Sequence, residues 1–166
     1  VAAVPITVRS KYLPDGVLQF NVVMDTFGCA ARGPNNIMKS KLTYLYHNGM
    51  LPDIKEWLRG PHKIGGKNYS YLVGEGENTK VVTDETFIEI LSRTTPQGNS
   101  MKAPAQAIHE FGLIPECLPL EDSMTWEQYM DQKRVIQEMI NLGKEFLKRL
   151  PINYEQVKLP VFFDAI

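Results

Sequence analysis

Apolar residues between positions 34 and 48 recur with the period of an α-helix, and they predict an amphipathic helix over 34–48. The apolar positions of its inner face are Met38, Leu42 and Leu45. Pro34 suits the first position of a helix, where its missing N–H has no intrahelical partner, and Asn48 with Gly49 is typical of a helix end. The alternative, a start at Cys29, would place Pro34 inside the helix and require a kink.

Two shorter segments also predict helices. The first covers 84–93, with Thr83 as its expected N-cap. Its apolar positions are Phe87, Ile88 and Leu91. The second covers 101–111, with Ser100 as the capping residue and Gly112 as the residue that ends it.

A capping box, formed by Thr125 and Gln128, opens the last helical pattern. Apolar residues continue at helical spacing to about Leu150, and Pro151 then stops the helix. These apolar positions are Val135, Met139, Leu142 and Phe146. The sequence therefore predicts one long helix from Thr125 to Leu150.

Strand signals are found mainly at the front and in the middle of the chain. Residues 1–24 contain "PITVRSKY" and "VLQFNVV" around the turn signal "LPDG", which fits a hairpin or two separate strands. Residues 50–82 read as irregular, with "NYSYLV" as a possible strand between loops. Together the elements predict a single domain over 1–166 that is α+β, or mainly α with minor β.

Composition narrows the classes of function. Hydrophobic residues are 43% and charged residues 22%, as in an ordinary globular protein, and the net charge of -1 argues against a nucleic-acid partner. No apolar run approaches the ~20 residues of a membrane helix, and no signal peptide is visible. The histidines, His47, His62 and His109, are scattered, so we expect no metal site and no cofactor.

The two cysteines, Cys29 and Cys117, are expected to be reduced thiols. Cys29 lies on the approach loop of the helix predicted from Pro34, within "MDTFGCAARGPNN". Its thiol is either a nucleophile at the mouth of a helix or a small half-buried side chain at a turn. For Cys117, within "PECLP", we expect a packed thiol without a chemical role.

Three segments occur in an order that resembles one family: "FGCAARGPNNIMKSKLTYLY", "TTPQGNSMKAPAQAIHEFG" and "GLIPECLPLED". The chain resembles the N-terminal, mainly helical portion of papain-like cysteine peptidases, and most of all their divergent branch from bacteriophages and bacteria. The resemblance covers roughly residues 15 to 160. It implies the helical half of a papain-like fold with a few short strands.

The resemblance implies a role for several residues. Cys29 matches the nucleophile, and Gln97, Gly98 and Asn99 match the turn that borders the substrate cleft. Gln19 is the upstream glutamine that would donate to an oxyanion, although it stands ten residues before Cys29 where the family spacing is six.

None of the three histidines matches the family's catalytic histidine, which comes from strands after the helical half. The resemblance thus implies that 1–166 is an incomplete domain whose C-terminal β portion, with the histidine, is a separate fragment. Such a protein would be a phage-encoded cysteine peptidase that is not competent as this chain alone, with a peptide or protein as substrate. The alternatives are an inactive structural protein of a virus particle, with the viral assembly as partner, and a cell-wall hydrolase or amidase. The expected location is the cytoplasm or the virion.

Overall fold

The computed structural model describes residues 12–14 and 23–153. In chain order its helices are α2 (Cys29–His47), α3 (Lys55–Arg59), α4 (Glu85–Leu91), α5 (Lys102–Phe111), α6 (Trp126–Tyr129) and α7 (Gln137–Arg149), with the 3₁₀ turns η1 (Gly76–Asn78) and η2 (Gln132–Arg134). The strands are β1 (His62–Ile64), β2 (Lys67–Tyr69), β3 (Leu72–Val73) and β4 (Lys80–Val81). The described part of the chain is therefore α+β, as predicted.

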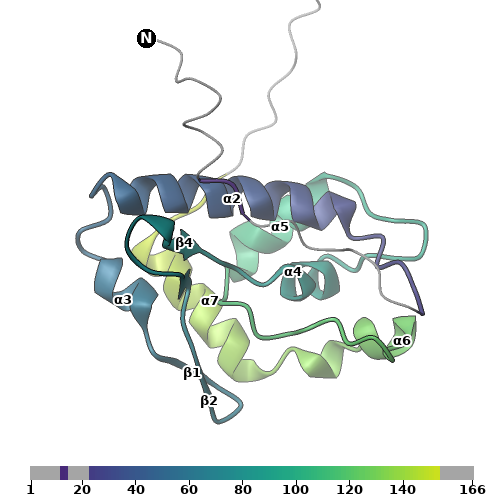
Figure 1. The fold of residues 1–166 in the computed structure, drawn as a ribbon. Coiled ribbons are helices and arrows are strands. Elements are labelled where there is room, and N and C mark those ends of the chain that lie inside the picture. The colour runs from purple at the N-terminus through teal and green to yellow at the C-terminus, as the bar shows by residue number, and fades with distance from the viewer. Residues whose placement is uncertain (1–11, 15–22, 154–166) are drawn as a thin grey trace, which may run out of the picture.

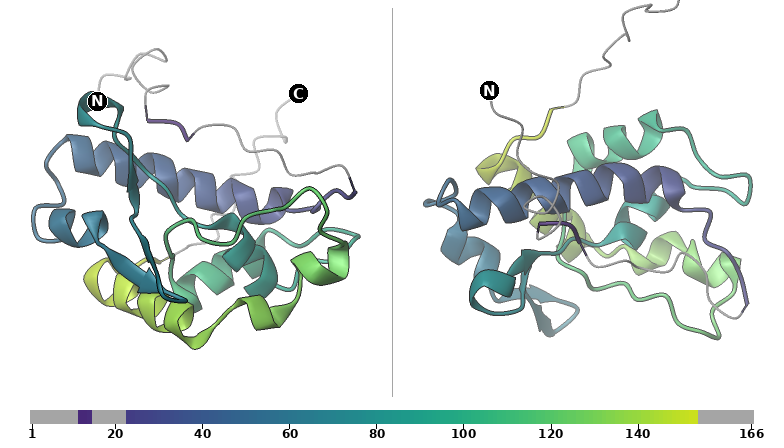
Figure 2. Two further views of the ribbon diagram at one scale, coloured as in Figure 1. Left: turned by 60° about the horizontal axis from the view of Figure 1, so that its bottom comes forward. Right: turned by 45° about the horizontal axis from the view of Figure 1, so that its top comes forward.

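The helices α4 and α5 lie between α2 and α7, and the core combines side chains of these helices with others from the strands and loops, among them Ile64, Tyr71 and Val81. Both α4 and α5 contact α2, and α5 also contacts α7 (Figure 1). The short strands form two separate antiparallel hairpins, β1 with β2 and β3 with β4, and β4 contacts α2. The hairpin of β3 and β4 lies with α3 toward the His47 end of α2, whereas the hairpin of β1 and β2 lies farther from α2, and β1 contacts α7 (Figures 1 and 2). The other end of α2, at Cys29, points away from the hairpins.

The helix α2 begins at Cys29, so the predicted start at Pro34 is wrong and the alternative start is correct. The carbonyl of Gly28 already accepts hydrogen bonds from the amides of Ala31 and Arg32, both at 2.9 Å. Burial of Ala30 and Ala31 against the core stabilises this first turn. Packing therefore extends the helix past the position that Pro34 favours locally.

The N-cap of α4 is Asp84, so the prediction of Thr83 is wrong. One carboxylate oxygen of Asp84 accepts the amide of Phe87 at 2.8 Å. The other accepts the amides of Cys117 at 2.7 Å and Leu118 at 2.6 Å. Thr83 instead donates its hydroxyl proton to Asn35 Oδ1 at 2.7 Å. Asp84 thus joins the start of α4 to the loop that follows α5.

The predicted helix over 101–111 is confirmed as α5, which begins at Lys102. The hydroxyl of Ser100 accepts the amide of Ala103 at 3.2 Å, which is the interaction of a capping residue. Gly112 ends the helix with φ 77°, a conformation that favours glycine.

The predicted long helix from Thr125 to Leu150 is wrong, because the segment forms three pieces, α6, η2 and α7. The capping box itself is confirmed: Thr125 and Gln128 exchange side-chain and backbone hydrogen bonds. The side chain of Asp131 then accepts a hydrogen bond from the amide of Lys133 at 2.9 Å, so α6 does not continue past this turn. Arg134 fixes the resulting turn by donating to the carbonyls of Tyr129 and Pro119, both at 2.8 Å.

The region over 50–82 contains more regular structure than predicted. It holds α3 and both hairpins, and the segment "NYSYLV" is divided between β2 and β3. In the first hairpin His62 pairs with Tyr69, and in the second Leu72 pairs with Val81. The strands predicted within residues 1–24 lie largely outside the described residues.

Candidate functional site

Cys29 is exposed and is the first residue of α2, a helix of 19 residues. The start of a helix carries backbone amides without an intrahelical partner and the positive end of the helix dipole. The first amides that bond within this turn belong to Ala31 and Arg32. The thiol therefore projects from a place where protein structures commonly bind or stabilise negative charge.

Exposed apolar side chains lie near this end of α2. Phe27 is 39% exposed, and its ring lies edge-on to that of Trp126, with the ring centroids 6.0 Å apart. Met101 is 65% exposed, and its Cε would lie 3.6 Å from a Cβ added to Gly33, one turn after Cys29. Phe27 has φ 51°, and Asp25 accepts its amide at 2.7 Å, which directs the chain into the helix.

The turn containing Gln97, Gly98 and Asn99 connects α4 with α5 at the same end of the molecule as Cys29 (Figures 1 and 2). Gln97 is exposed, and Gly98 has φ 89° in a bridge with Thr95. The side-chain Nδ2 of Asn99 donates to the backbone carbonyl of Ser92 at 2.9 Å. Asn99 therefore stabilises the turn, whereas Gln97 is accessible to a ligand. Gln19 lies outside the described residues.

The three histidines make their hydrogen bonds away from Cys29. His47, at the opposite end of α2, lies 2.6 Å from the carbonyl of Thr79. His62 lies 2.7 Å from the carbonyl of Trp57, and His109 lies 2.9 Å from that of Ile152. Burial lowers the pKa of His62, although its backbone hydrogen bond to Trp57 opposes the shift. None of these contacts brings an imidazole to the thiol.

A buried cluster of charges lies under the first half of α2, and the sequence analysis missed it. Arg32 approaches Glu85 at 3.0 Å, and Lys39 approaches the other oxygen of Glu85 at 2.8 Å. Glu89 lies 3.4 Å from Arg32 and accepts the hydroxyl proton of Tyr129 at 2.7 Å. The spacing gave a signal, since Arg32, Asn35 and Lys39 share one face of α2, and this face is turned toward the core, where Asn35 is fully buried.

Glu89 lies against the residue that precedes Cys29. A Cβ added to Gly28 would be 1.9 Å from Glu89 Oε1, so only glycine leaves room for the carboxyl group. Glu89 is fully buried, and this burial raises its pKa to about 7. The hydrogen bond from Tyr129 and the charge of Arg32 oppose the shift, whereas Glu85 and Asp84 add to it. A carboxyl group that titrates near neutrality thus lies beneath the start of α2.

Glu89→Gln is expected to reduce the pH dependence of stability. The pKa of Glu89 rises from 4.5 to about 7 on folding, so between these values the folded protein holds a proton that the unfolded chain releases. The free energy of unfolding should therefore fall by about 3 kcal/mol as the pH rises through this window, and then level off. Urea unfolding of both proteins between pH 4.5 and 8 measures this. Burial also raises the pKa of Asp84 to about 6, and this contribution is the same in the unchanged protein and in Glu89→Gln. If stability depended on pH equally in the two proteins, the raised pKa of Glu89 would be wrong.

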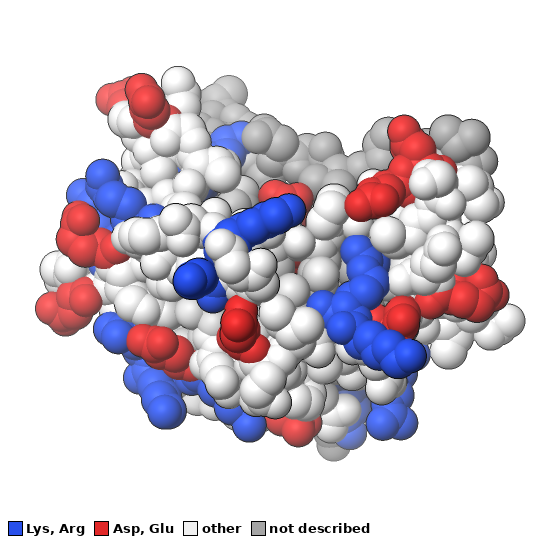
Figure 3. Space-filling model, turned by 90° about the horizontal axis from the view of Figure 1, so that it is seen from below, with Lys and Arg blue, Asp and Glu red and all other residues white. Residues whose placement is uncertain are grey.

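Charge on the surface is mixed. On the face shown in Figure 3, lysine and arginine side chains alternate with aspartate and glutamate. Among the described residues, no three histidine, cysteine, aspartate or glutamate side chains are placed to hold a metal ion. No helix in that same part of the chain is long and apolar enough to cross a membrane.

Comparison with known proteins supplies no relative. No protein-family model, no curated protein and no solved structure matches this chain.

Proposed function

We propose that this chain carries the nucleophile of a papain-like cysteine peptidase, with Cys29 as the attacking thiol. The observation that supports this is the exposed position of Cys29 as the first residue of a long helix. The turn at Gln97 and Gly98, on the same end of the molecule, would border the bound peptide. The exposed side chains of Phe27 and Met101 would give it apolar contacts.

The chemistry follows from this geometry. The thiolate would attack the carbonyl carbon of a peptide bond, and the negative charge would move to the carbonyl oxygen. The amides of the first turn of α2 that lack an intrahelical partner would donate hydrogen bonds to that oxygen. A general base must take the thiol proton and return it to the leaving amine. His47, His62 and His109 all make their hydrogen bonds away from Cys29, so none of them would act as this base. Another segment or chain would have to supply it.

The second candidate is an inactive structural or interaction protein, for example of a virus particle, that keeps the shape without the reaction. It is favoured by the same histidine contacts, each of which is made away from Cys29. The two candidates differ in what Cys29→Ala does. If the protein is a peptidase, Cys29→Ala abolishes peptide hydrolysis. If it is a structural protein, Cys29→Ala leaves its assembly unchanged.

Iodoacetamide is expected to label Cys29 at least ~10-fold faster than Cys117 in the folded protein, because only the accessible thiolate reacts. Cys29 is exposed, whereas Cys117 is half-buried, and burial together with the charge of Asp84 raises the pKa of the Cys117 thiol. Peptide mapping of the labelled protein over time gives both rates. Labelling in urea is the control, since unfolding should make the two rates similar.

A peptidyl epoxide that targets cysteine peptidases then tests the function itself. It should modify Cys29 in the presence of any segment that supplies the base, and Cys29→Ala should lose both modification and peptide hydrolysis. Cys117→Ala is the matched control and should keep both. Hydrolysis that survives Cys29→Ala, or equal labelling of the two cysteines in the folded protein, would exclude Cys29 as the nucleophile.

A further inference from the structure

A cavity of about 730 Å³ lies at the end of α2 opposite to Cys29. It is lined by the end of α2, by α3 and by the turn that joins β3 to β4. Its residues are Tyr46, His47, Lys55, Arg59, Ser70, Leu72, Gly74, Glu75, Gly76, Glu77 and Thr79. This volume is typical of sites for small ligands. Because a helix rises ~1.5 Å per residue, the 18 steps from Cys29 to His47 separate the cavity from the thiol by ~27 Å.

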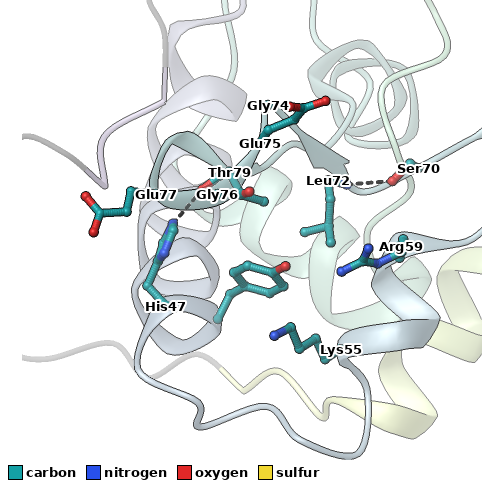
Figure 4. Close-up of a pocket in the computed structure, with 11 residues that line it drawn as sticks. His47, Lys55, Arg59, Ser70, Leu72, Gly74, Glu75, Gly76, Glu77 and Thr79 are labelled. Carbon is teal, nitrogen blue, oxygen red and sulfur yellow. Dashed lines mark hydrogen bonds between the residues drawn. The ribbon is translucent and has the colours of Figure 1, made fainter.

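The positive side chains point into the cavity and the negative ones point away. Figure 4 shows Lys55, Arg59 and Leu72 directed toward a common space beside His47. Glu75 and Glu77, on the turn between β3 and β4, point away from this space. The interior of the cavity is therefore positive, although its lining contains as many glutamates as lysines and arginines.

Both cations keep hydrogen-bond donors for a ligand. Lys55 Nζ lies 5.1 Å from the centre of the Tyr46 ring, a cation–π contact that uses none of its N–H groups. Arg59 Nε lies 3.6 Å from Glu56, but the two side chains are 58% and 79% exposed, so water weakens this pair. A guanidinium has five N–H donors, and a carboxylate can accept two of them at once.

The surrounding charge selects the kind of anion. The two positive charges of Lys55 and Arg59 exceed the single negative charge of a carboxylate, and Glu75 and Glu77 at the rim disfavour the second negative charge that a phosphate would add. Leu72 and the ring of Tyr46 offer apolar contact to the carbon chain next to the carboxylate. His47 directs its Nε2 proton to the carbonyl of Thr79, so it holds the wall in place.

We propose that this cavity binds the side-chain carboxylate of an acidic peptide segment, through Arg59 and Lys55. The site is separate from Cys29 and does not depend on the chemistry proposed for that thiol. It would hold a peptide whose acidic residue is followed or preceded by an apolar residue.

Amide NMR spectra of the full chain, titrated with N-acetyl-leucyl-glutamyl amide, test the proposal. The expected result is saturable shifts of the amides of Ser70, Gly74, Gly76 and Thr79, and none with the neutral N-acetyl-leucyl-glutaminyl amide. Lys55→Gln combined with Arg59→Gln should weaken binding by about tenfold or more, since it removes two charge-assisted hydrogen bonds. Lys67→Gln, which changes the charge on β2 outside the cavity, is the matched control and should bind as the unchanged protein does.

Three results would overturn the proposal. They are equal binding of the neutral peptide, undiminished binding by the double variant, and a loss of binding in Lys67→Gln as large as that in the double variant.

Inorganic phosphate is titrated in parallel. Saturation of the same amides by phosphate at a lower concentration than by the acidic peptide would assign the cavity to phosphate and reject the carboxylate. The amide spectrum of the unbound double variant shows whether its fold is kept. Arg59→Lys, which retains the positive charge, should bind measurably and provides a second variant.

Discussion

Gly143→Ala is expected to destabilise the protein by about 3 kcal/mol or more, at the upper end of the cost of overpacking. A Cβ on Gly143 would lie 2.1 Å from the carbonyl oxygen of Phe111, and one on Gly112 would lie 1.9 Å from the carbonyl of Gly143. The end of α5 and the middle of α7 thus cross with backbone against backbone. No flexible side chain can yield there, so the two helices must move apart and loosen the core around Ile114 and Phe146.

Thermal or urea unfolding measures this effect. For a chain of this size, about 3 kcal/mol corresponds to a fall in Tm of roughly 6–12 °C. Lys144→Ala is the matched control, because Lys144 is the next residue of α7 and is exposed, and its change should stay within about 0.5 kcal/mol. If Gly143→Ala were as stable as this control, the close crossing of α5 and α7 would be wrong.

Glu85→Leu is expected to cost about 3–5 kcal/mol, because it leaves buried positive charge without its partner. Glu85 is the shared partner of Arg32 and Lys39, at 3.0 and 2.8 Å, and the side chains of Glu85 and Lys39 are only 8% and 4% exposed. Arg32 would keep Glu89, but Lys39 would have no described carboxylate beside it. Urea unfolding gives the free energy directly.

Two further variants separate the lost pair from other effects. In Lys39→Met combined with Glu85→Leu, both partners are apolar, and stability should recover in part. Glu56→Gln breaks the exposed pair with Arg59, and it should change stability by less than about 1 kcal/mol. If Glu85→Leu cost no more than Glu56→Gln, or if the double variant were less stable than the single one, the buried cluster would not contribute as described.

Most of the helical framework could be predicted from the sequence, and its boundaries less well. The spacing of Met38, Leu42 and Leu45 and the terminating Gly112 indicated α2 and the end of α5 correctly. Pro34 misled the prediction of where α2 begins, because burial of Ala30 and Ala31 outweighs a local preference. The break after α6 depends on Asp131 and on the distant carbonyl of Pro119, which a periodic pattern does not reveal.

The candidate site divides in the same way. The local sequence placed Cys29 close to the start of a helix, but its position as the first residue of α2 depends on the burial of Ala30 and Ala31 in the core. The shared face of Arg32 and Lys39 indicates charge on one side of α2, but the sequence does not show which carboxylates pair with it. These partners come from α4, and Glu85 lies 46 positions after Lys39 in the chain. The cavity beside His47 likewise combines three segments that only the fold brings together.

The hydrogen bonds of Asp84 have a consequence for how the protein can vary. One carboxylate secures the start of α4 and the amides of Cys117 and Leu118, on both sides of the turn at Gln97. The chain between these anchors can therefore be lengthened at the exposed tip of that turn without loosening the anchors. A lineage of such proteins could remodel this turn by insertion and deletion, while the start of α4 and the loop after α5 stay joined through one carboxylate.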